Sequence, residues 1–367
     1  MSEKIAKKII LGLSGGVDSA VCARLLVERG FDVSTVFLEC WNTPGCRTDQ
    51  DRKDALKIAL DLNLPFQVLD FKQAYKDKVL AYFFSEYQAG RTPNPDVMCN
   101  KEIKFGLFYD WAMKNGFEYV ATGHYAKIVD EQLIIPKDTH KDQTYFLHLL
   151  NKEQLRHIIF PLAELTKKEV RAKATQDGLA VADKKDSVGI CFVGDINVQD
   201  FLKQRLGEKP GAVVDSDGNV VGQHRGLWFY TIGQRSGFTI NPTKVIKTSA
   251  GKLISKQNVP PFYVIGKKAA ENQLVVGFGA ETAQQNFAVE NLHLIDPQNP
   301  LPKNNLFVRI RHTGQLLACR LKKVADDQFE VKLDQVAGGI ASGQSAVFYF
   351  KQKNLVICLG GGIITTP

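Results

Sequence analysis

The stretch "SGGVDS", from Ser14 to Ser19, is the first place in the chain where residue types and spacing indicate chemistry. It lies between an apolar run and a predicted helix, where unpaired backbone N–H groups and the helix dipole favour an anion. Gly15 and Gly16 allow a tight turn and a close approach to a ligand. Ser14 and Ser19 can donate hydrogen bonds to phosphate oxygens, and Asp18 can act through a magnesium ion. The pattern predicts a phosphate-binding loop rather than a plain strand-to-helix turn, although both GxGxxG and GxxxxGK[ST] are absent.

Two further stretches carry cysteines in chemically suggestive surroundings. In "GRTPNPDVMCNKEIKFG", Asp96 precedes Cys99 by three residues in a loop whose path two X-Pro units restrict. A carboxylate near a thiol can accept or return a proton, and the neighbouring Lys101 and Lys104 favour the thiolate. In "KKDSVGICFVGD", Cys191 lies in an apolar run that follows a charged loop. Taken alone, Cys99 is more often an inert loop cysteine, and Cys191 is more often a buried core cysteine.

Composition narrows the class of protein. The 367 residues are 44% hydrophobic, which is enough for two or three domains. The net charge of +8 suits a polyanionic partner but is equally compatible with an ordinary basic enzyme. Seven cysteines with no CxxC pair argue against a disulfide framework or a zinc knuckle. We expect a cytoplasmic protein, because no secretory signal and no membrane-spanning apolar run is present.

The predicted secondary structure around these residues changes along the chain, from alternating strands and helices to short strands. Residues 1–205 alternate strand-like and helical patterns, which predicts an α/β domain with a parallel, doubly wound sheet. Strands are expected at 7–14, 32–40, 66–71 and 118–125, and helices at 18–30, 49–63 and 73–88. Thr166 and Glu169 form a capping-box pattern at the start of a further helix that closes at Gly178. Residues 206–278 predict a small β-rich domain with a hairpin at 262–279, and residues 279–367 predict a small β-barrel or sandwich.

The phosphate loop resembles the pyrophosphate-binding loop of the ATP pyrophosphatases, the PP-loop superfamily. Six motifs, in order along essentially the whole chain, closely match one branch of it, the bacterial-type tRNA-specific 2-thiouridylases. These motifs are "GRTPNPDVMCN", "ATGHYA", "KDQTYFL", "GICFVGD", "GLWFYTIGQR" and "GQSAVFYF…CLGGGII". The resemblance implies an adenine-nucleotide α-hydrolase-like N-terminal domain followed by a central β-rich domain and a C-terminal β-barrel that contacts tRNA.

The resemblance also implies a reaction. Such an enzyme thiolates C2 of the wobble uridine, position 34, in tRNAs for Lys, Glu and Gln, and releases AMP and pyrophosphate. Cys191 matches the cysteine that receives a persulfide sulfur, Cys99 matches the catalytic nucleophile, and Asp96 is the expected acid/base. Sulfur transfer would leave a Cys99–Cys191 disulfide, and the resemblance also allows hydrosulfide to be released before it attacks the uridine. The sulfur donor would be a carrier protein or a cysteine desulfurase, and we expect a monomer.

Binding residues follow from the same match. ATP, with Mg²⁺, is expected at Gly12, Leu13, Ser14, Gly15, Gly16, Val17, Asp18, Ser19, Leu38 and Gly123. The anticodon loop of tRNA is expected at Asn94, Pro95, Asp96, His124, Lys141, Asp142, Gln143, Arg311, His312 and Gln344. His124 is alternatively a satisfied strand-end histidine, and Arg311 a solvated barrel residue. No resident metal other than magnesium is expected.

Three alternatives remain open at this point. The chain could be another adenylating synthetase, a thiolase that acts at uridine 8 or cytidine 32, or a catalytically silent RNA-binding protein. An iron–sulfur cluster on Cys99, Cys191 and a further ligand is a weak possibility. Cys40 and Cys46 lie in a segment unlike the family versions. They are either incidental or an auxiliary sulfur-relay or metal site, and the first interpretation is favoured.

Overall fold

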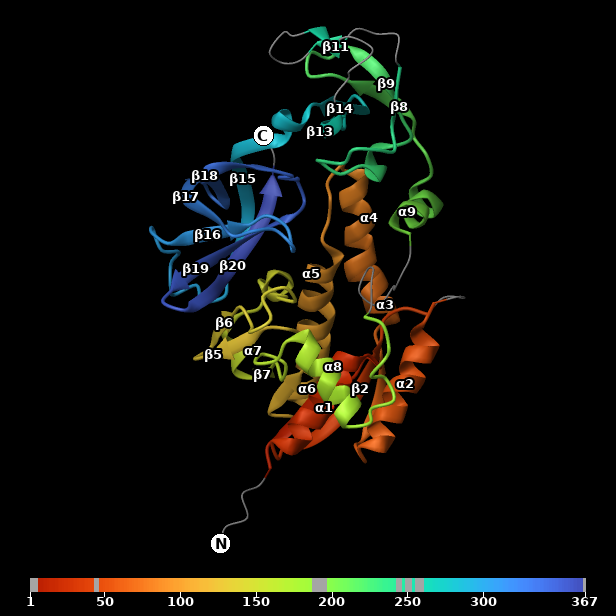
Figure 1. The fold of residues 1–367 in the computed structure, drawn as a ribbon, viewed down its shortest axis with the longest axis vertical. Coiled ribbons are helices and arrows are strands. Elements are labelled where there is room, and N and C mark those ends of the chain that lie inside the picture. The colour runs from red at the N-terminus through yellow and green to blue at the C-terminus, as the bar shows by residue number, and fades with distance from the viewer. Residues whose placement is uncertain are drawn as a thin grey trace.

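The fold has three parts that follow one another along the chain (Figure 1). The computed structural model describes residues 6–42, 46–186, 197–241, 246–247, 253–254 and 261–365. An α/β domain holds the N-terminus, a small β-rich part lies at the opposite end of the molecule, and a barrel lies to one side between them. The predicted fold class is therefore confirmed, whereas the predicted domain bounds stay predictions.

The N-terminal sheet is parallel throughout its described strands. They are β1 (Lys8–Gly12), β2 (Asp32–Glu39), β3 (Phe66–Asp70), β4 (Tyr119–Ala121) and β7 (Ile158–Ile159), in the order β3-β2-β1-β4-β7. The chain moves outward from β1 to β3 and then returns to the other side of β1 with β4. This reversal creates a crevice at the carboxyl ends of β1 and β4, where ligands bind in open α/β sheets.

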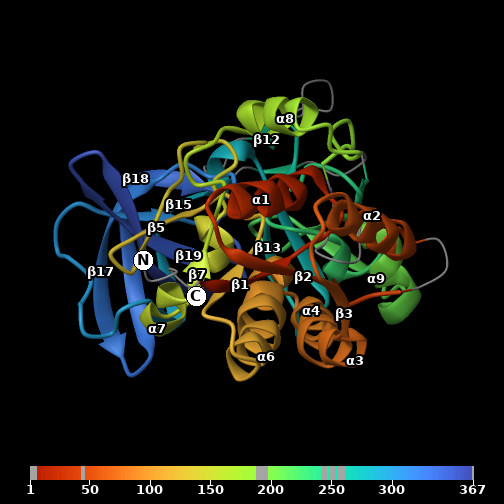
Figure 2. The same ribbon diagram turned by 90° about the horizontal axis from the view of Figure 1, so that it is seen from below.

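Helices cover both faces of this sheet (Figure 2). On one face lie α1 (Val17–Glu28), α2 (Thr48–Asp61) and α8 (Lys167–Gln176). On the other lie two longer helical columns, each containing a π-helical stretch. The first is α3 (Lys72–Tyr75), η1 (Lys76–Leu80) and α4 (Ala81–Gln88), and the second is α5 (Pro95–Cys99), η2 (Asn100–Leu107) and α6 (Phe108–Lys114). The short α7 (Lys152–Arg156) and the 3₁₀ turn η3 (Thr144–Leu147) complete the domain.

The central part packs against the end of α4. It contains α9 (Val198–Leu206) and a sheet in the order β10-β9-β8-β14-β13. The strands are β8 (Gly211–Val214), β9 (Val220–His224), β10 (Thr239–Ile240), β13 (Tyr263–Lys268) and β14 (Gln273–Gly277), with β11 (Ile246–Lys247) paired to β12 (Leu253–Ile254). The predicted hairpin is formed by β13 and β14. Phe83 and Tyr87 of α4 share one buried core with Leu202 and Tyr230, so the two parts are joined by apolar packing.

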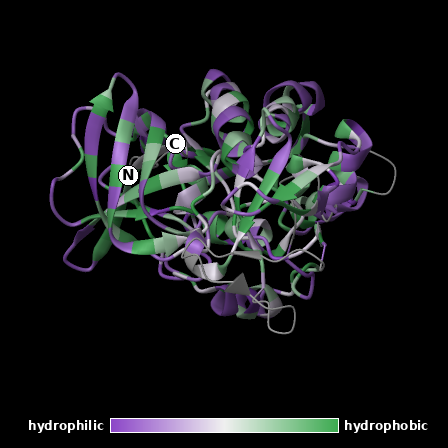
Figure 3. Ribbon diagram, turned by 90° about the horizontal axis from the view of Figure 1, so that it is seen from above, coloured by the Kyte–Doolittle hydropathy of each residue, from purple (hydrophilic) through white to green (hydrophobic). Residues whose placement is uncertain are grey.

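The C-terminal part is a closed antiparallel barrel. Its strands are β15 (Ala283–Leu294), β18 (Gln328–Gly338), β17 (Leu317–Ala325), β16 (Leu306–Arg309), β19 (Ser345–Gln352) and β20 (Leu355–Thr365), and β20 pairs back to β15. Apolar and polar residues alternate along these strands, as expected when one face lines a core (Figure 3). The C-terminal part is thus a barrel and not a sandwich, the two folds that the sequence left open.

One hairpin of the N-terminal domain belongs to the barrel sheet. β5 (Lys127–Val129) and β6 (Gln132–Ile134) pair with each other, and β6 pairs with β20 through Leu133 and Ile134. Both side chains are buried. The first and last parts of the chain are therefore joined by backbone hydrogen bonds as well as by packing. None of the helices in the described ranges is long and apolar enough to cross a membrane.

Candidate nucleotide and RNA site

The phosphate loop lies at the crevice of the sheet, between the end of β1 and the start of α1. Ser19 Oγ accepts a hydrogen bond from the Ser14 backbone N at 3.2 Å and donates to the Gly16 carbonyl at 3.1 Å. The Ser14 and Ser19 hydroxyl oxygens are 3.1 Å apart. No side chain of the described residues caps α1 at Gly16, so the first N–H groups of this helix are available to an anion.

Two glycines of the predicted site allow the loop to lie against its neighbours. Gly15 has a φ of +74°, and a Cβ there would collide with the backbone oxygen of Asp51 in α2. Gly123 follows β4, and a Cβ there would come within 3.2 Å of the Ser19 backbone N. The structure therefore brings Gly123 to the loop, as the resemblance implies, and both positions favour a residue without a side chain.

The remaining predicted nucleotide residues are buried around the same crevice. Leu13 and Val17 are in the core beneath the loop, whereas Leu38 lies at the end of β2. Leu38 and Cys99 belong to one buried cluster, so the end of β2 and the end of α5 share a core.

Asp18 is the acidic residue of the loop. Its carboxylate accepts a hydrogen bond from the Tyr125 hydroxyl at 2.7 Å and pairs with Lys167 Nζ at 2.6 and 2.7 Å. The side chain keeps 31% of its surface exposed. A partly exposed carboxylate in the same loop as the Ser14 and Ser19 hydroxyls offers the oxygen ligands that magnesium prefers, so the residue types present fit that ion.

A charged network extends from this carboxylate to α8. Lys167 Nζ also lies 2.9 Å from Asp186, which further pairs with Lys141 at 2.8 Å and with Arg171 at 2.6 Å. Partial burial raises the pKa of Asp186, but the hydrogen bonds from Lys141 and Lys167 outweigh it and hold this pKa well below its ordinary value. The carboxylate therefore stays ionised at neutral pH.

A second lysine contacts the loop backbone. Lys184 Nζ donates to the Gly15 carbonyl at 2.9 Å and pairs with Asp51 at 2.7 Å and Asp54 at 2.5 Å. Lys184 and Asp186 precede the stretch that contains Cys191, which lies outside the described residues, as do residues 187–196 as a whole. The predicted role of Cys191 is thus untested by the geometry.

The second predicted cysteine ends a short helix. Asn94 caps α5 by accepting a hydrogen bond from Val97 N at 3.3 Å, and Pro95 occupies the first helical position. Asp96 is half-buried in the first turn, and Cys99 is fully buried at the last residue of α5. A buried cysteine can react only after the surrounding side chains give access to it, so its catalytic role stays a prediction.

His124 is enclosed in the core rather than presented at a surface. Its Nδ1 is 2.7 Å from the Thr122 hydroxyl, and its ring packs near Phe105 and Phe160. Burial, aided by the charge of Lys104, lowers the pKa of His124 well below its ordinary value, so the ring is neutral. This geometry matches the alternative of a satisfied strand-end histidine, and the tRNA contact stays a prediction.

Lys141, Asp142 and Gln143 each contact a different element. Lys141 pairs with Asp186, as described above. Asp142 pairs with Arg309 of the barrel at 2.6 Å and also accepts hydrogen bonds from the Thr144 N and hydroxyl. Gln143 Oε1 accepts a hydrogen bond from the Tyr125 backbone N at 2.9 Å. These side chains therefore connect the barrel with the phosphate loop, and contact with tRNA stays a prediction for all three.

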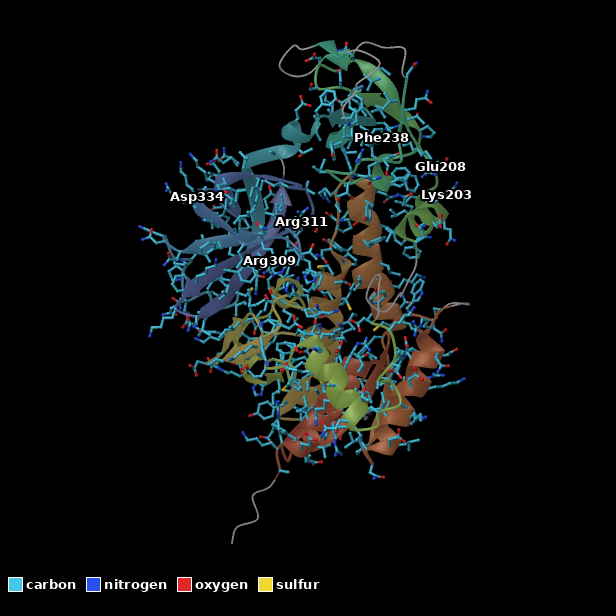
Figure 4. All side chains as sticks on the ribbon, viewed as in Figure 1. Lys203, Glu208, Phe238, Arg309, Arg311 and Asp334 are labelled. Carbon is cyan, nitrogen blue, oxygen red and sulfur yellow. The ribbon has the colours of Figure 1, made fainter. Side chains whose placement is uncertain are left out.

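The predicted barrel residues lie on the side of the N-terminal domain. Gln344 Nε2 donates to the Thr92 and Pro93 carbonyls at 2.9 and 3.1 Å and so holds the loop before α5. The His312 ring lies 4.2 Å from the Phe146 ring at 30°. Arg311 is exposed and follows Arg309 by two residues (Figure 4). Gln344 and His312 thus contact the N-terminal domain, whereas Arg311 is exposed to solvent, and contact with tRNA stays a prediction for all three.

Comparison with known proteins identifies the chain. Domain models match residues 7–195, 199–278 and 284–364, and they are described as the tRNA methyl transferase HUP domain, the tRNA methyl transferase PRC-barrel domain and the aminomethyltransferase beta-barrel domain. The tRNA-specific 2-thiouridylase MnmA of Shewanella sediminis is 39% identical over 98% of this chain and 95% of its own length. That of Proteus mirabilis is 39% identical over 100% of this chain and 99% of its own. The chain belongs to the tRNA-specific 2-thiouridylase family.

Solved structures add little to this assignment. The U34-tRNA thiolase NcsA from Methanococcus maripaludis is 21% identical over 47% of this chain and 57% of its own, with a TM-score of 0.34. Membership in the 2-thiouridylase family therefore rests on the full-length relatives, which match all three parts of the chain.

The sequence analysis missed several side chains that this 2-thiouridylase places at the loop. They are Tyr125, Lys167, Lys184 and Asp186. A signal existed for two of them, because Lys184 and Asp186 directly precede the "SVGIC" stretch and are charged beside an apolar run. Lys167 lies between the capping-box residues Thr166 and Glu169, and nothing in its spacing points to Asp18.

The two unusual cysteines show no metal geometry. Cys40 is buried at the end of β2, whereas Cys46 Sγ lies 3.4 Å from the Thr48 hydroxyl. Within the part of the chain that the structure describes, no group of three His, Cys, Asp or Glu side chains could hold a metal ion. The role of Cys40 and Cys46 stays open.

Proposed function

We propose that this chain catalyses the ATP-dependent 2-thiolation of the wobble uridine, position 34, in tRNAs for Lys, Glu and Gln. One observation carries the proposal. The phosphate loop follows β1 at the carboxyl edge of the sheet, and Leu38, near the end of the neighbouring strand β2, shares a buried cluster with Cys99 at the end of α5. Family membership supports a tRNA-uridine 2-sulfurtransferase, and the loop supports nucleotide binding at this edge of the sheet.

ATP makes an unreactive oxygen into a leaving group. The N–H groups at the start of α1, with the Ser14 and Ser19 hydroxyls, would bind the phosphates. Asp18 would hold a magnesium ion, which neutralises phosphate charge when bound. Attack of the uridine C2 oxygen on the α-phosphorus would form the C2–O–AMP bond and release pyrophosphate. AMP can then leave from C2, which the original oxygen could not do.

Sulfur transfer would use both predicted cysteines. The terminal sulfur of a Cys191 persulfide would attack C2 and displace AMP, and Asp96 would accept the released proton. The Cys99 thiolate would then attack the Cys191 sulfur, which breaks the S–S bond to the uridine sulfur and leaves a Cys99–Cys191 disulfide. In the second route, Cys99 attacks first and releases hydrosulfide, which attacks C2. Either route oxidises two thiols, so an external thiol must reduce the disulfide before the next turnover.

Recognition of tRNA would depend on the anticodon loop. The target base must leave the stack to reach the crevice, which costs least in a single-stranded loop. The proposed contacts are the ten residues that the resemblance implies, namely Asn94, Pro95, Asp96, His124, Lys141, Asp142, Gln143, Arg311, His312 and Gln344. The net charge of +8 supports phosphate binding with strong salt dependence. We further propose that the chain acts as a monomer in the cytoplasm and receives sulfur from a carrier protein or a cysteine desulfurase.

The test is a measurement of 2-thiouridine in cellular tRNA. Cells that lack their own 2-thiouridylase receive the wild-type chain, Cys99→Ser or Cys191→Ser, and nucleosides from bulk tRNA are quantified by mass spectrometry. We expect restoration by the wild type and a loss of at least a hundredfold in either variant. Cys319→Ser is the matched control, because Cys319 is buried in the barrel wall away from the loop. Normal thiolation by Cys99→Ser or Cys191→Ser would rule out the paired-cysteine mechanism.

The other adenylating activities give a different result in the same system. A small-molecule synthetase would release AMP in the absence of tRNA and would retain this activity in the double cysteine variant. A thiolase acting at uridine 8 or cytidine 32 would change the corresponding nucleosides and leave 2-thiouridine at background.

A further inference from the structure

The phosphate loop carries no cation of its own. The lysine of the GxxxxGK[ST] loop, which contacts phosphates directly, has no counterpart between Gly12 and Ser19. In this chain a lysine reaches the loop from another helix. Lys167, the first residue of α8, places its ammonium 2.6 and 2.7 Å from the two oxygens of Asp18. Only 14% of the Lys167 side chain is exposed.

The backbone of Lys167 is fixed by three kinds of contact. Its N–H donates to the Asp138 carboxylate at 2.8 Å. Thr166 and Glu169 form a capping box around it, with Glu169 Oε2 accepting from Thr166 N at 2.6 Å. Val170 and Ala174 of the same helix belong to the core that also contains the buried face of α1. The fold therefore fixes the backbone of Lys167 relative to the loop. Only the side chain of this lysine can change its direction.

Both partners of the ammonium keep other partners when it moves. Asp18 retains the Tyr125 hydroxyl at 2.7 Å. Asp186 retains Lys141 at 2.8 Å and Arg171 at 2.6 Å, and Arg171 also donates to the Lys184 carbonyl at 3.1 Å. Three cations thus surround two carboxylates in this network. Asp186 therefore keeps two cations when Lys167 turns to an incoming polyanion, whereas Asp18 keeps the Tyr125 hydroxyl and would be left to hold a magnesium ion.

We propose that Lys167 is a nucleotide-contacting residue that supplies, from α8, the cationic contact to the phosphates of ATP that the loop itself lacks. In the resting protein the ammonium is held by Asp18 and Asp186. With phosphates bound at the N-terminus of α1, the ammonium would turn towards them, and Asp18 would be the residue left to hold a magnesium ion. This inference rests on the proposed function in one respect only, namely that the loop binds ATP.

The test compares ligands that differ in their phosphates. The full-length wild-type protein, Lys167→Met and Lys167→Arg are titrated with ATP, inorganic pyrophosphate and AMP in the presence of magnesium, and heat of binding is recorded. We expect Lys167→Met to weaken the binding of ATP and of pyrophosphate by at least tenfold. The affinity for AMP should change by less than threefold. Lys167→Arg, which keeps the charge, should recover part of the pyrophosphate affinity. Lys173→Met on the same helix is the matched control, because Lys173 pairs with Glu28 and Asp177 instead of the loop.

Each result has one interpretation. Pyrophosphate affinity within twofold of the wild type in Lys167→Met overturns the proposal. An equal loss for AMP and pyrophosphate also overturns it, because it indicates that Lys167 only maintains the shape of the loop. If thermal unfolding shows that Lys167→Met does not fold, the pyrophosphate affinities of Lys167→Arg and Asp186→Asn test the proposal instead. Asp186→Asn frees the ammonium from one partner and should leave pyrophosphate binding equal or tighter, whereas weaker binding contradicts the proposal. A wild-type protein that binds no ATP would refute the proposed function instead.

Discussion

Asp142 and Arg309 form a buried salt bridge between the N-terminal domain and the barrel. Their charged atoms are 2.6 Å apart, and their side chains are 1% and 10% exposed. Asp142 is anchored further by the Thr144 N–H and hydroxyl, and the Arg309 guanidinium lies 5.0 Å from the centre of the Tyr349 ring. The two residues are 167 positions apart in the chain. The pair therefore fixes the barrel against residues 141–143, which contact Asp186 and Tyr125 next to the phosphate loop.

Removal of one partner of this pair should destabilise the protein strongly. Arg309→Met keeps the length of the side chain but leaves the Asp142 carboxylate buried without its cation. We expect a loss of about 3–5 kcal/mol in the free energy of unfolding. Urea unfolding followed by circular dichroism measures it. Arg311→Met, two residues away and exposed, should change the same free energy by less than about 0.5 kcal/mol. Equal effects of the two variants would contradict the structural role of the pair.

A methyl group at Gly15 should damage the phosphate loop. Gly15→Ala must place a Cβ against the Asp51 carbonyl while φ remains at +74°. Gly30→Ala is the matched control, because φ is +78° there but nothing lies within 4 Å of the added Cβ. In the control, the free energy of unfolding should fall only by the cost of holding alanine in the left-handed backbone conformation, about 1–2 kcal/mol. Its affinity for ATP should stay at the wild-type value. Gly15→Ala should lose ATP binding by more than tenfold in calorimetric titration. Wild-type affinity in Gly15→Ala would show that the loop does not contact the nucleotide.

His148 should make stability depend on pH below neutrality. It is fully buried, and its Nδ1 is 2.8 Å from the Tyr145 carbonyl. Burial lowers the pKa of His148 from 6.5 to about 4, despite the opposing hydrogen bond to Tyr145. The unfolded chain therefore binds a proton that the native protein does not bind between pH 6.5 and about 4. The native state loses stability as the pH falls through this window, by a total on the order of 3 kcal/mol.

The variant His148→Asn isolates this contribution. The amide keeps a donor near the Tyr145 carbonyl but does not titrate. Urea unfolding of the wild type and the variant at pH 7.5, 6.0 and 5.0 gives the difference in stability at each pH. The stability of the wild type relative to the variant should decrease as the pH falls, because only the wild type has a buried histidine that is protonated on unfolding. A difference that is constant with pH would show that His148 has an ordinary pKa.

Local patterns in the sequence predict the elements that contact only their own neighbours in the chain. The capping box of Thr166 and Glu169 is formed as predicted, because both hydrogen bonds span three residues. The predicted helix over 18–30 is observed as α1, with Gly30 in the left-handed conformation after its end. The hairpin of β13 and β14 follows for the same reason, because its two strands are neighbours in the chain. The π-helical stretches η1 and η2 are not predicted, since helical periodicity does not distinguish them from α-helix.

Contacts between distant parts of the chain could not be predicted in this way. Lys167 and Asp18 are 149 residues apart, and no spacing rule selects one lysine of α8 over another. The resemblance assigns Asp142 and His124 to tRNA, whereas the structure shows what else they hold: a buried ion pair and a buried hydrogen bond to Thr122. Residue types therefore locate the site on the sequence, and tertiary packing decides which partner each side chain receives.

The pairing of β6 with β20 means that the order of synthesis and the order of assembly differ. The hairpin of residues 127–134 leaves the ribosome long before its partners Ile357 and Cys358. Until then, Leu133 and the open edge of β6 have no strand to cover them, and such edges promote association between chains. A chain cut before β15 keeps this exposed edge permanently. The N-terminal part is therefore complete as a folded surface only when β20 has been made.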